Sequence, residues 1–521
     1  MNRKPVMIAL DAGTSMLKAV ALGLDGEPVA IESRANVYRE SPGGGAEQDM
    51  ALTWSNAAAT IGALVERIDG AEVTGLAVTG QGDGTWLVDA DGAPAGPALL
   101  WLDGRAGRIV ERIRNSEAGR RHFRETGTGL AACNQSGQLL WLAENRPGQI
   151  ARAATAMHCK DWIYFNLTGE RATDPSEGSF TFGSWRTRGY SDVTIAALGV
   201  ERFRHLLPPI VDGVRTHHKL GEGPARRLGL TPGLPVTLGY LDVVCSALGA
   251  GIYGTGEDCG AAILGSTGIN MRLADDDFEH PADAPMSGFR FAFPVPGKTA
   301  LVQSSMAATL NIDWLVGIAD QAVRLTGHEP DHTAMLAALD TAVLAASPAQ
   351  AMYHPYISAA GERGPFTEAR ARASLAGFDR GLDLPGLMRT VYEGLALGAA
   401  DCFAAMGGAP AIISITGGAS RSVAMRAIFA AMVNRKVRII REHGSGALGA
   451  AMIAAVSLGI MPDMAECARR WVAPLLGEIE APDAELAGLY APLHEIYRDA
   501  RGTMTGFWQG FGRFQEARHG G

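Results

Sequence analysis

The stretch VMIALDAGTSMLKAVAL, residues 6–22, decides the fold of this chain. It holds an apolar run from Val6 to Leu10, a polar turn, and a second apolar run from Leu17 to Leu22 that ends before Asp25-Gly26. Short apolar runs separated by turn residues are typical of β-strands. The stretch therefore predicts a β-hairpin with a further strand after it.

The turn of this hairpin, Asp11-Ala12-Gly13-Thr14-Ser15, has the chemistry of a phosphate site. Glycine lets the backbone approach an anion, while Thr14 and Ser15 supply hydroxyl and amide donors to phosphate oxygens. Asp11, at the end of the first strand, is placed to hold hydrated Mg²⁺. Taken alone, the pattern is equally compatible with an ordinary hairpin.

The same arrangement returns in GAAILGSTGINMRL, residues 260–273. Its turn, Gly265-Ser266-Thr267-Gly268, can grip nucleotide phosphates from the opposite domain, as paired hairpins do in actin-like and hexokinase-like ATPases. Between the two stretches, apolar residues recur at helical spacing from Trp54 to Ile68, and an apolar run from Val73 to Thr79 follows. This order indicates that helices and strands alternate along the chain. We therefore predict an α/β fold with two duplicated domains around a nucleotide cleft.

The length of the chain supports this division. A chain of 521 residues is too long for one hydrophobic core, because cores stop growing at about 250–300 residues. With 47% hydrophobic and 19% charged residues, the chain can bury ample apolar surface. We expect a first domain at 1–250, a second at 251–462, and closing helices at 463–521 with a frayed end at Gly520-Gly521.

Charge and cysteine usage limit the partners and the compartment. A formal net charge of −9 argues against a broad electrostatic grip on nucleic acid. The six cysteines show no CxxC pair, which favours reduced thiols and a cytoplasmic location. The first apolar run is too short for a signal peptide, and the uncharged stretch from Gly444 to Pro462 is rich in Gly, Ala and Ser. That composition predicts a tightly packed buried helix rather than a membrane span.

A third glycine turn follows an apolar run from Ile412 to Thr416. The turn, Gly417-Gly418-Ala419-Ser420, leads into a helical pattern from Val423 to Val433 that we expect Ser420 to cap. Such a turn admits one face of an adenosine. It is also compatible with a tight strand-to-helix connection that needs small residues.

Asp242 is the candidate general base. It follows the apolar run from Pro235 to Tyr240 and opens an Ala- and Gly-rich helix that leads into the second domain. An aspartate at a helix start is usually a cap. Phosphoryl transfer to a hydroxyl, however, needs a carboxylate near the domain junction to orient that hydroxyl and take its proton.

Further motifs identify a family. In order, the chain shows Glu47-Gln48-Asp49 with Trp54, Trp101-Leu102-Asp103-Gly104-Arg105, Leu139-Leu140-Trp141-Leu142 with Glu144-Asn145 and Pro147, Lys160-Asp161-Trp162, Leu167-Thr168-Gly169-Glu170, Ala172-Thr173-Asp174, and Gly361-Glu362-Arg363 with Pro365. From about residue 6 to about residue 460, it resembles the FGGY carbohydrate kinases. The resemblance implies an actin-like, hexokinase-like two-domain fold, ATP and Mg²⁺ in the cleft, and a small sugar or polyol held mainly by the first domain.

The resemblance also implies roles for individual residues. Asp242 falls at the position of the family's catalytic base, while Asp11 remains the metal candidate from its place at the end of the first strand. The expected acceptor-binding residues are Gln81, Gly82, Asp83, Asp103 and Arg105. The expected nucleotide-binding residues are Thr14, Ser15, Lys18, Gly265, Ser266, Thr267, Gly417, Gly418 and Ser422, with Thr309 as a weaker candidate.

Two positions depart from the family pattern. Gln138 stands where many relatives carry lysine before the Leu-Leu-Trp run, which removes a charge. Glu442 and His443 precede Gly444-Ser445-Gly446 with a spacing that does not match the family pattern.

Two functional alternatives remain open on the sequence. An actin-like ATPase that works as a chaperone or sensor would share both phosphate turns, but it would need neither the acceptor residues nor a base at Asp242. Among the kinases, VTGQGDGTW at residues 78–86, followed by Trp101-Leu102-Asp103, is most similar to the erythritol kinases, with a pentulose or pentitol kinase as the alternative. Trp86 and Trp101 are candidates for apolar pocket walls or for core residues, and assembly into a homo-oligomer is left open.

Overall fold

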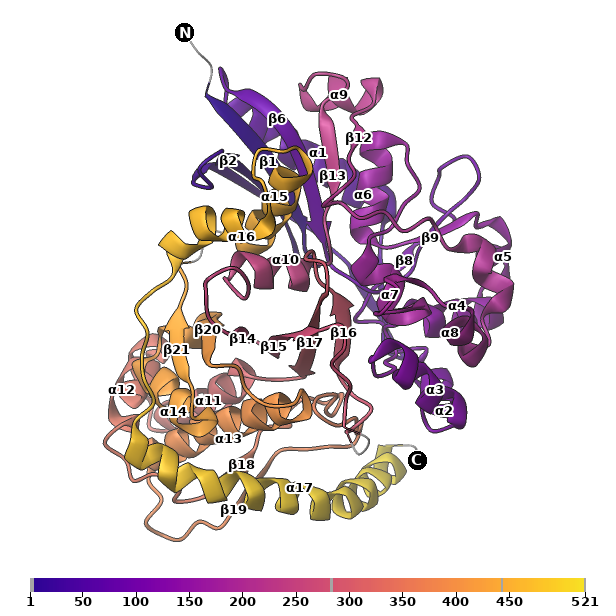
Figure 1. The fold of residues 1–521 in the computed structure, drawn as a ribbon. Helices are drawn as coiled ribbons and strands as arrows, with labels where there is room; N and C mark the ends of the chain where they lie inside the picture. Colours follow the sequence, from indigo (N-terminus) through magenta and orange to yellow (C-terminus); the bar gives the residue numbers. More distant parts are fainter. Residues whose placement is uncertain (1–3, 282–283, 442–443, 520–521) are drawn as a thin grey trace.

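The computed structural model describes residues 4–281, 284–441 and 444–519. The expected departure at Glu442 and His443 and the expected frayed end at Gly520 and Gly521 lie outside these residues. Among the described residues, two six-stranded mixed sheets form the framework, each covered by helices (Figure 1).

The first sheet contains the predicted hairpin and the strand expected after it. Its order is β12 (His218–Lys219), β13 (Pro235–Leu238), β6 (Glu72–Gly80), β1 (Pro5–Ala12), β2 (Met16–Gly23) and β3 (Pro28–Ala35). β1, β6 and β13 are parallel, whereas β2 and β3 are antiparallel to their neighbours. β1 and most of β6 are buried because helices cover both of their faces, which explains their continuous apolar runs.

The second sheet repeats this pairing. Its order is β16 (Phe289–Ala292), β17 (Lys298–Ser305), β15 (Gly268–Asp275), β14 (Cys259–Leu264), β20 (Ile412–Thr416) and β21 (Lys436–Ile439). β14, β20 and β21 are parallel. β15 is antiparallel to β14 and β17 is antiparallel to β15, just as β2 is antiparallel to β1 and β3 to β2. The predicted duplication is confirmed, whereas the domain boundaries at 250 and 462 stay predictions.

Helices of the first half pack on the first sheet and form a lobe beside it. α1 (Met50–Arg67) lies on β2 and β3, and α6 (Cys159–Thr168) lies on β6 and β13. Asp49 caps α1 by accepting from the backbone of Leu52. The other helices are α2 (Gly107–Arg114), α3 (Glu117–Thr126), α4 (Gln135–Asn145), α5 (Pro147–Arg152), α7 (Pro175–Phe182), α8 (Asp192–Leu198) and α9 (Glu222–Leu228).

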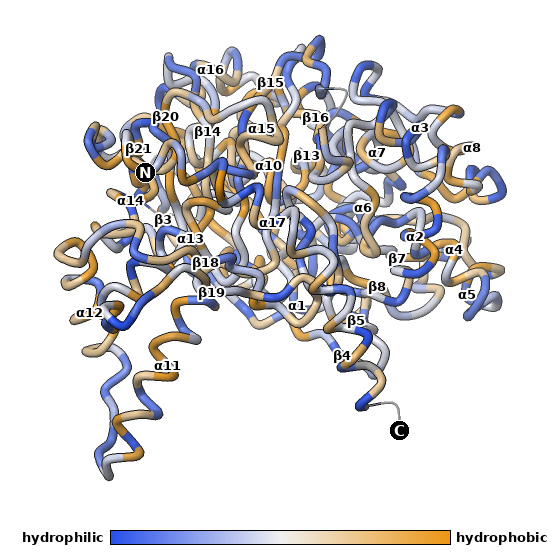
Figure 2. The backbone as a smooth tube through the Cα atoms, turned by 90° about the horizontal axis from the view of Figure 1, so that it is seen from below, coloured by the Kyte–Doolittle hydropathy of each residue, from blue (hydrophilic) through white to orange (hydrophobic). Residues whose placement is uncertain are grey.

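Helices of the second half surround the second sheet. They are α11 (Thr309–Leu325), α12 (His332–Val343), α13 (Leu384–Ala405), α14 (Val423–Val433) and α17 (Ala484–His519), whereas α16 (Met464–Cys467) packs on the helix Ser445–Ser457. The long α17 packs on α13 and α14, whereas the C-terminal end of α11 projects from the body of the molecule (Figure 2).

The expected cap of α14 is wrong. Ser422, not Ser420, accepts from the backbone of Met425 at 2.8 Å. The helix has the expected bounds, but residues Gly418–Arg421 before it form a 3₁₀ turn, and Ser420 donates to the carbonyl of Gly417 at 2.7 Å.

Two helices cross between the halves of the molecule. α10 (Asp242–Gly249) follows β13 of the first sheet, packs on α15 and lines a small cavity with residues of β14 and β15, whereas α15 (Ser445–Ser457) follows β21 but packs on β1 and β6 (Figure 1). The helices touch closely, because a Cβ at Gly449 would lie 2.6 Å from the carbonyl carbon of Cys245. This crossing places Asp242 at the junction of the two domains.

The remaining elements are short. They are β4 (Arg39–Ser41), β5 (Gly45–Gln48), β7 (Trp86–Val88), β8 (Ala98–Leu99), β9 (Thr155–Met157), β10 (Gly183–Ser184), β11 (Gly189–Tyr190), β18 (Met352–His354), β19 (Ser374–Ala376), the 3₁₀ turns Glu201–Leu206 and Ala473–Leu475, and the π-helical turn Ala468–Val472. All six cysteines are free and buried. Over the described ranges, no helix combines the length and apolarity needed to cross a bilayer, and α15 is buried as expected.

Candidate active site

A cavity of about 220 Å³ lies between the two halves of the molecule. Five of the residues expected in the site line it together: Thr14, Gly82, Asp83, Asp242 and Thr267. The other lining residues are Trp101, Cys133, Phe180, Leu241, Val243, Ile269, Phe289, Phe291, Val302, Ser304 and Arg363. The volume is below the roughly 300–1,000 Å³ of pockets for drug-sized ligands, which favours a small ligand.

Aromatic side chains from both halves form the apolar wall of this cavity. Phe180 of α7 packs against Phe289 and Phe291 of β16, with ring centroids 6.2 and 5.1 Å apart. Of the two tryptophans considered for the wall, Trp101 lines the cavity, whereas Trp86 is fully buried in the core.

Asp242 points its carboxylate into the cavity instead of capping α10. Leu241 occupies the N-cap position, and Asp242 is the first helical residue. Its Oδ1 accepts only from the adjacent backbone N–H of Val243, at 2.6 Å, so it does not reach the second or third helical residue as a capping side chain does.

The pKa of Asp242 is strongly perturbed. Burial raises it to about 8, and the negative charges of Asp11 and Glu177 add to the effect. A carboxyl group that titrates near neutral pH is suited to general base catalysis. The side chain therefore combines the position and the basicity that the proposed chemistry needs.

Asp11 lies at the end of β1, opposite Lys18 across the hairpin. Burial raises the pKa of Asp11 to about 6, although Lys18 opposes the shift. A Cβ at Gly446 of α15 would overlap the Oδ2 of Asp11, so the glycine leaves room for the carboxylate at the start of that helix. Mg²⁺ in kinases is usually bound by one or two carboxylates plus substrate phosphates, and a partly accessible Asp11 near Asp242 fits that requirement.

Thr14 is held by side chains on both sides of the first hairpin. It accepts from the indole N–H of Trp101 at 2.8 Å and donates to Gln81 Oε1 at 3.0 Å. Gln81 in turn donates to Gln48 at 2.9 Å. Gln81 therefore stands behind Thr14 and does not line the cavity, while Ser15 is exposed at the tip of the turn.

Asp83 has a backbone conformation with φ of 58° and is fixed from two directions. Its N–H donates to Glu177 Oε1 at 3.1 Å, and its Oδ2 accepts from Asn134 at 3.0 Å. Its Oδ1 is buried and finds no hydrogen-bond partner among the described residues. Asp83 can therefore accept a hydrogen bond from a ligand hydroxyl.

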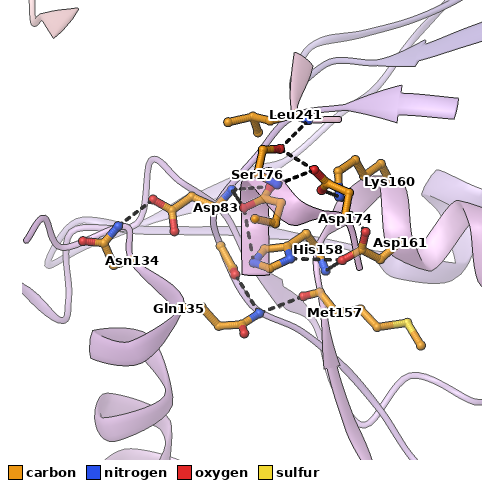
Figure 3. Close-up of polar contacts among 12 residues, drawn as sticks. Asp83, Asn134, Gln135, Met157, His158, Lys160, Asp161, Asp174, Ser176 and Leu241 are labelled. Atoms are coloured by element: carbon orange, nitrogen blue, oxygen red, sulfur yellow. Dashed lines mark hydrogen bonds and ion pairs between the residues drawn. The ribbon is translucent and has the colours of Figure 1, made fainter. Parts of the chain in front are cut away.

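A buried ionic network connects Asp83 with the start of α10 (Figure 3). From Glu177 it runs through His158, at 3.5 Å, to Asp161, whose Oδ2 lies 3.0 Å from His158 Nδ1. Lys160 Nζ then lies 2.6 Å from both Asp161 and Asp174.

The network ends at the backbone next to Asp242. Ser176 donates to Asp174 and accepts from the N–H of Leu241 at 3.0 Å. A Cβ at Gly82 would overlap the side chain of Leu241, so the two segments touch directly as well. Asp83 and Asp242 are thus positioned by one continuous set of contacts.

The charged groups of the network shift the pKa values of one another. Burial raises the pKa of Glu177 to about 7, although His158 and Lys160 oppose it. Burial would lower the pKa of His158, but Glu177 and Asp161 raise it above its usual value. Lys160, Asp161 and Asp174 belong to the sequence motifs, but the sequence assigned them no role. It did not indicate that His158 and Glu177 belong to the site. The available signal was the pair Lys160-Asp161 inside an otherwise apolar helix.

Asp103 and Arg105 do not line the cavity. Asp103 is buried and accepts from the N–H of Ala46 at 2.9 Å and from Arg105 Nε at 3.0 Å. Arg105 also pairs with Glu47 at 2.7 Å and lies 4.3 Å above the ring of Trp141. Both side chains are therefore committed to each other and to their protein neighbours.

Gln138, the departure from the family pattern, supports the same wall. Its amide donates to the carbonyl of Leu100 at 2.9 Å and so fixes the residue before Trp101.

The predicted nucleotide residues of the second half gather around its hairpin. The N–H groups of Ala308 and Thr309 donate to the carbonyls of Ser266 and Gly265, at 2.8 and 2.9 Å. Gly417 has φ of 88°, and a Cβ there would lie 2.6 Å from the carbonyl carbon of Leu264.

Further from the hairpin, Gly418 opens the 3₁₀ turn and Ser422 caps α14. The hydroxyl of Ser422 also contacts Asp340. Their contact with a nucleotide stays a prediction.

Comparison with known proteins gives a consistent result. Residues 6–249 match the N-terminal domain, and residues 260–458 the C-terminal domain, of the FGGY family of carbohydrate kinases. The chain is 44% identical to an erythritol kinase from Brucella abortus over 96% of this chain and 97% of that protein. It is 25% identical to a xylulose kinase from Staphylococcus xylosus over 90% and 94% of the two chains. Its fold matches the crystal structure of a gluconate kinase from Lactobacillus acidophilus with a TM-score of 0.87 at 22% identity, covering 97% and 99% of the two chains.

Proposed function

This chain belongs to the FGGY family of carbohydrate kinases, and we propose that its acceptor is erythritol, converted to erythritol 4-phosphate at the expense of ATP. Family membership supports the kinase interpretation over that of a chaperone or sensor. The observation that carries the proposal is the small cavity between the domains, which is lined by Asp83 and by a partly buried Asp242 of raised pKa.

In this proposal the chain's own residues orient and deprotonate the acceptor. Asp83 accepts from one acceptor hydroxyl, and Asp242 accepts the proton of the terminal hydroxyl as that oxygen bonds to the γ-phosphorus. The bond from the γ-phosphorus to the β,γ-bridging oxygen breaks, and ADP leaves. The two hairpins supply backbone donors to the nucleotide phosphates from opposite sides.

We further propose that Mg²⁺ is held beside Asp11. When bound, the cation would neutralise phosphate charge and would lower the pKa values of Asp11 and Asp242 from those of the metal-free protein. Room for the carboxylate beside Gly446 supports this position.

The size and polarity of the cavity favour a four-carbon polyol. An uncharged polyol is recognised through hydrogen bonds to several hydroxyls, and the cavity is lined by carboxylate acceptors and aromatic rings. The relative with 44% identity is an erythritol kinase, which supports the same acceptor. A pentulose or pentitol is the second candidate, because the more distant relatives include xylulose kinases.

A panel of acceptors tests this assignment. We expect kcat/KM for erythritol to exceed the values for threitol, glycerol, xylitol, ribulose and xylulose in a coupled ADP assay. The kcat/KM for glycerol should be clearly lower than that for erythritol, because glycerol lacks one hydroxyl and leaves a buried polar group of the site unpaired. A clear lead for a pentulose or pentitol would refute the four-carbon assignment, and ADP release without any stimulation by acceptor would argue for the ATPase alternative.

We also propose a cytoplasmic location. Six free, buried thiols are typical of a protein that folds in a reducing compartment. Cell fractionation with activity measured in each fraction tests it, and activity recovered only from an exported fraction would contradict it.

A further inference from the structure

Arg363 enters the cavity from the second domain. It belongs to the loop Gly361-Glu362-Arg363-Gly364, and Glu362 fixes that loop by accepting from the N–H groups of Met306 and Arg363, at 2.9 and 2.8 Å. The Arg363 guanidinium donates to Ser304 at 2.8 Å and lies 5.6 Å from the ring of Trp101, which belongs to the first domain. The side chain therefore spans the space between the domains.

The hydrogen-bonding capacity of Arg363 is largely unused. A guanidinium carries five N–H donors, and among the described residues its only hydrogen bond is the one to Ser304. Its Nε is buried without a partner, and no carboxylate within the described ranges forms an ion pair with it. Placing a cation in a partly buried site without a partner is unfavourable, so the arrangement is explained if a ligand completes it.

Arg363 lines the same cavity as Asp83 and Asp242. Asp83 Oδ1 is a buried acceptor and Arg363 Nε a buried donor, and neither has a hydrogen-bond partner among the described residues. Together they offer an acceptor and a donor to ligand hydroxyls other than the one that Asp242 would deprotonate.

We propose that Arg363 is an acceptor-binding residue that donates to the hydroxyl at the end of the polyol opposite the reacting hydroxyl. This inference rests on the proposed function and adds a specificity determinant from the second domain. The acceptor would then be bound from both sides of the cleft, by Asp83 of one domain and Arg363 of the other. Full affinity for the acceptor would require the two domains in this closed arrangement.

The test combines a protein change with a ligand change. Arg363→Met removes the donors but keeps much of the apolar stem, and butane-1,2,3-triol of matching stereochemistry lacks the distal hydroxyl of erythritol. For erythritol, we expect Arg363→Met to lower kcat/KM roughly 10- to 100-fold, mainly through KM. For the triol, the same variant should change kcat/KM by less than about threefold, because the lost contact is already absent. The KM for ATP should change by less than about twofold.

Two further variants make the result interpretable. Arg363→Lys, which retains a cation, should recover part of the erythritol activity, and Arg380→Met, an exposed arginine of the same half, should behave as wild type. Equal losses on erythritol and the triol, or a parallel rise in the KM for ATP, would overturn the proposal and leave Arg363 a structural residue. If wild type prefers another acceptor, the proposed function fails, and the same comparison with that acceptor and its terminal deoxy analogue still tests Arg363.

Discussion

The two hairpins at the cleft share a backbone arrangement and differ in chemistry. One step before the turn, the first hairpin pairs Asp11 with Lys18, whereas the second pairs Ile263 with Ile269. The helices that cross between the halves differ in the same way, since α10 begins with Asp242 and α15 with Ser445.

This difference shows what duplication supplies and what it leaves to individual residues. Both hairpins offer backbone N–H groups near the cleft, a property of the fold that needs only glycine and small polar residues. The titratable groups proposed for metal binding and proton transfer occur in one copy only. The predictions below test whether the charged copy alone carries that chemistry, from the largest expected effect to the smallest.

Loss of the base should have the largest effect. We expect Asp242→Asn to lower kcat by roughly two orders of magnitude or more with the best acceptor, because the amide cannot take the proton, while ATP binding stays nearly intact. Asp192→Asn is a matched control, since Asp192 is also the first residue of a helix but is 94% exposed. Similar, small effects of both changes on kcat would show that Asp242 acts only at the helix start.

Removal of the metal-binding acid should have the next largest effect. We expect Asp11→Asn to raise the Mg²⁺ concentration for half-maximal activity roughly tenfold or more, because a carboxylate ligand is lost. Asp25→Asn, at an exposed position after the same hairpin, should leave the Mg²⁺ dependence unchanged. An unaltered Mg²⁺ titration of Asp11→Asn, or full activity in excess EDTA, would remove the proposed distinction between the hairpins.

A methyl group placed against the Asp11 carboxylate should have a smaller effect on the Mg²⁺ requirement. In Gly446→Ala the new methyl group would press on Asp11 Oδ2, so we expect a several-fold higher requirement for Mg²⁺ with little change in the KM for the acceptor. Gly223→Ala in α9 has open space around the added methyl and should not alter either value. Wild-type Mg²⁺ dependence in Gly446→Ala would show that the carboxylate can move away without cost.

The smallest expected effect is on thermal stability. Folding raises the pKa of Asp242 from 3.8 to about 8, so its stabilising contribution is present below pH 3.8 and is lost as pH rises through 8. Asp242→Asn should therefore raise the Tm of the metal-free protein by a few degrees at pH 8 and by much less near pH 4.

A buried acid whose pKa is lowered by folding, not raised, provides the control for this measurement. The pKa of Asp161 is held below its usual value by Lys160 and His158, although burial opposes the shift. Asp161→Asn should lower the Tm at neutral pH, and its deficit should shrink on acidification. A pH-independent change in Tm for Asp242→Asn would contradict the raised pKa.

The sequence predicted much of the fold because the decisive patterns are local. The hairpins of residues 6–22 and 260–273, and the strand ending at Thr416, depend on apolar runs and turn residues a few positions apart. Local patterns also have limits, since the helix after Thr416 begins past a 3₁₀ turn and is capped by Ser422 instead of Ser420.

The candidate site was predicted unevenly for a related reason. Of the motif residues that follow strands, Thr14, Asp83 and Asp242 line the cavity together, whereas their contact with a ligand stays a prediction. Asp103 and Arg105 do not line the cavity, because their own pairing and contacts with Ala46 and Glu47 engage them elsewhere. Sequence spacing does not show which of several polar residues in one motif will face a ligand.

The sequence by itself predicted the duplicated fold, and it indicated the two candidate phosphate turns and Asp242 as the candidate base. Only the tertiary structure decided that α15 packs on the first sheet and against α10, that Trp101 fixes Thr14 across 87 positions of chain, and that Arg363 reaches toward Trp101 from the other domain. The physical reason is the separation along the chain over which each interaction acts. Strand and turn propensities act between neighbours in the chain, whereas burial, pKa and unpaired hydrogen-bonding groups arise only when distant segments pack together.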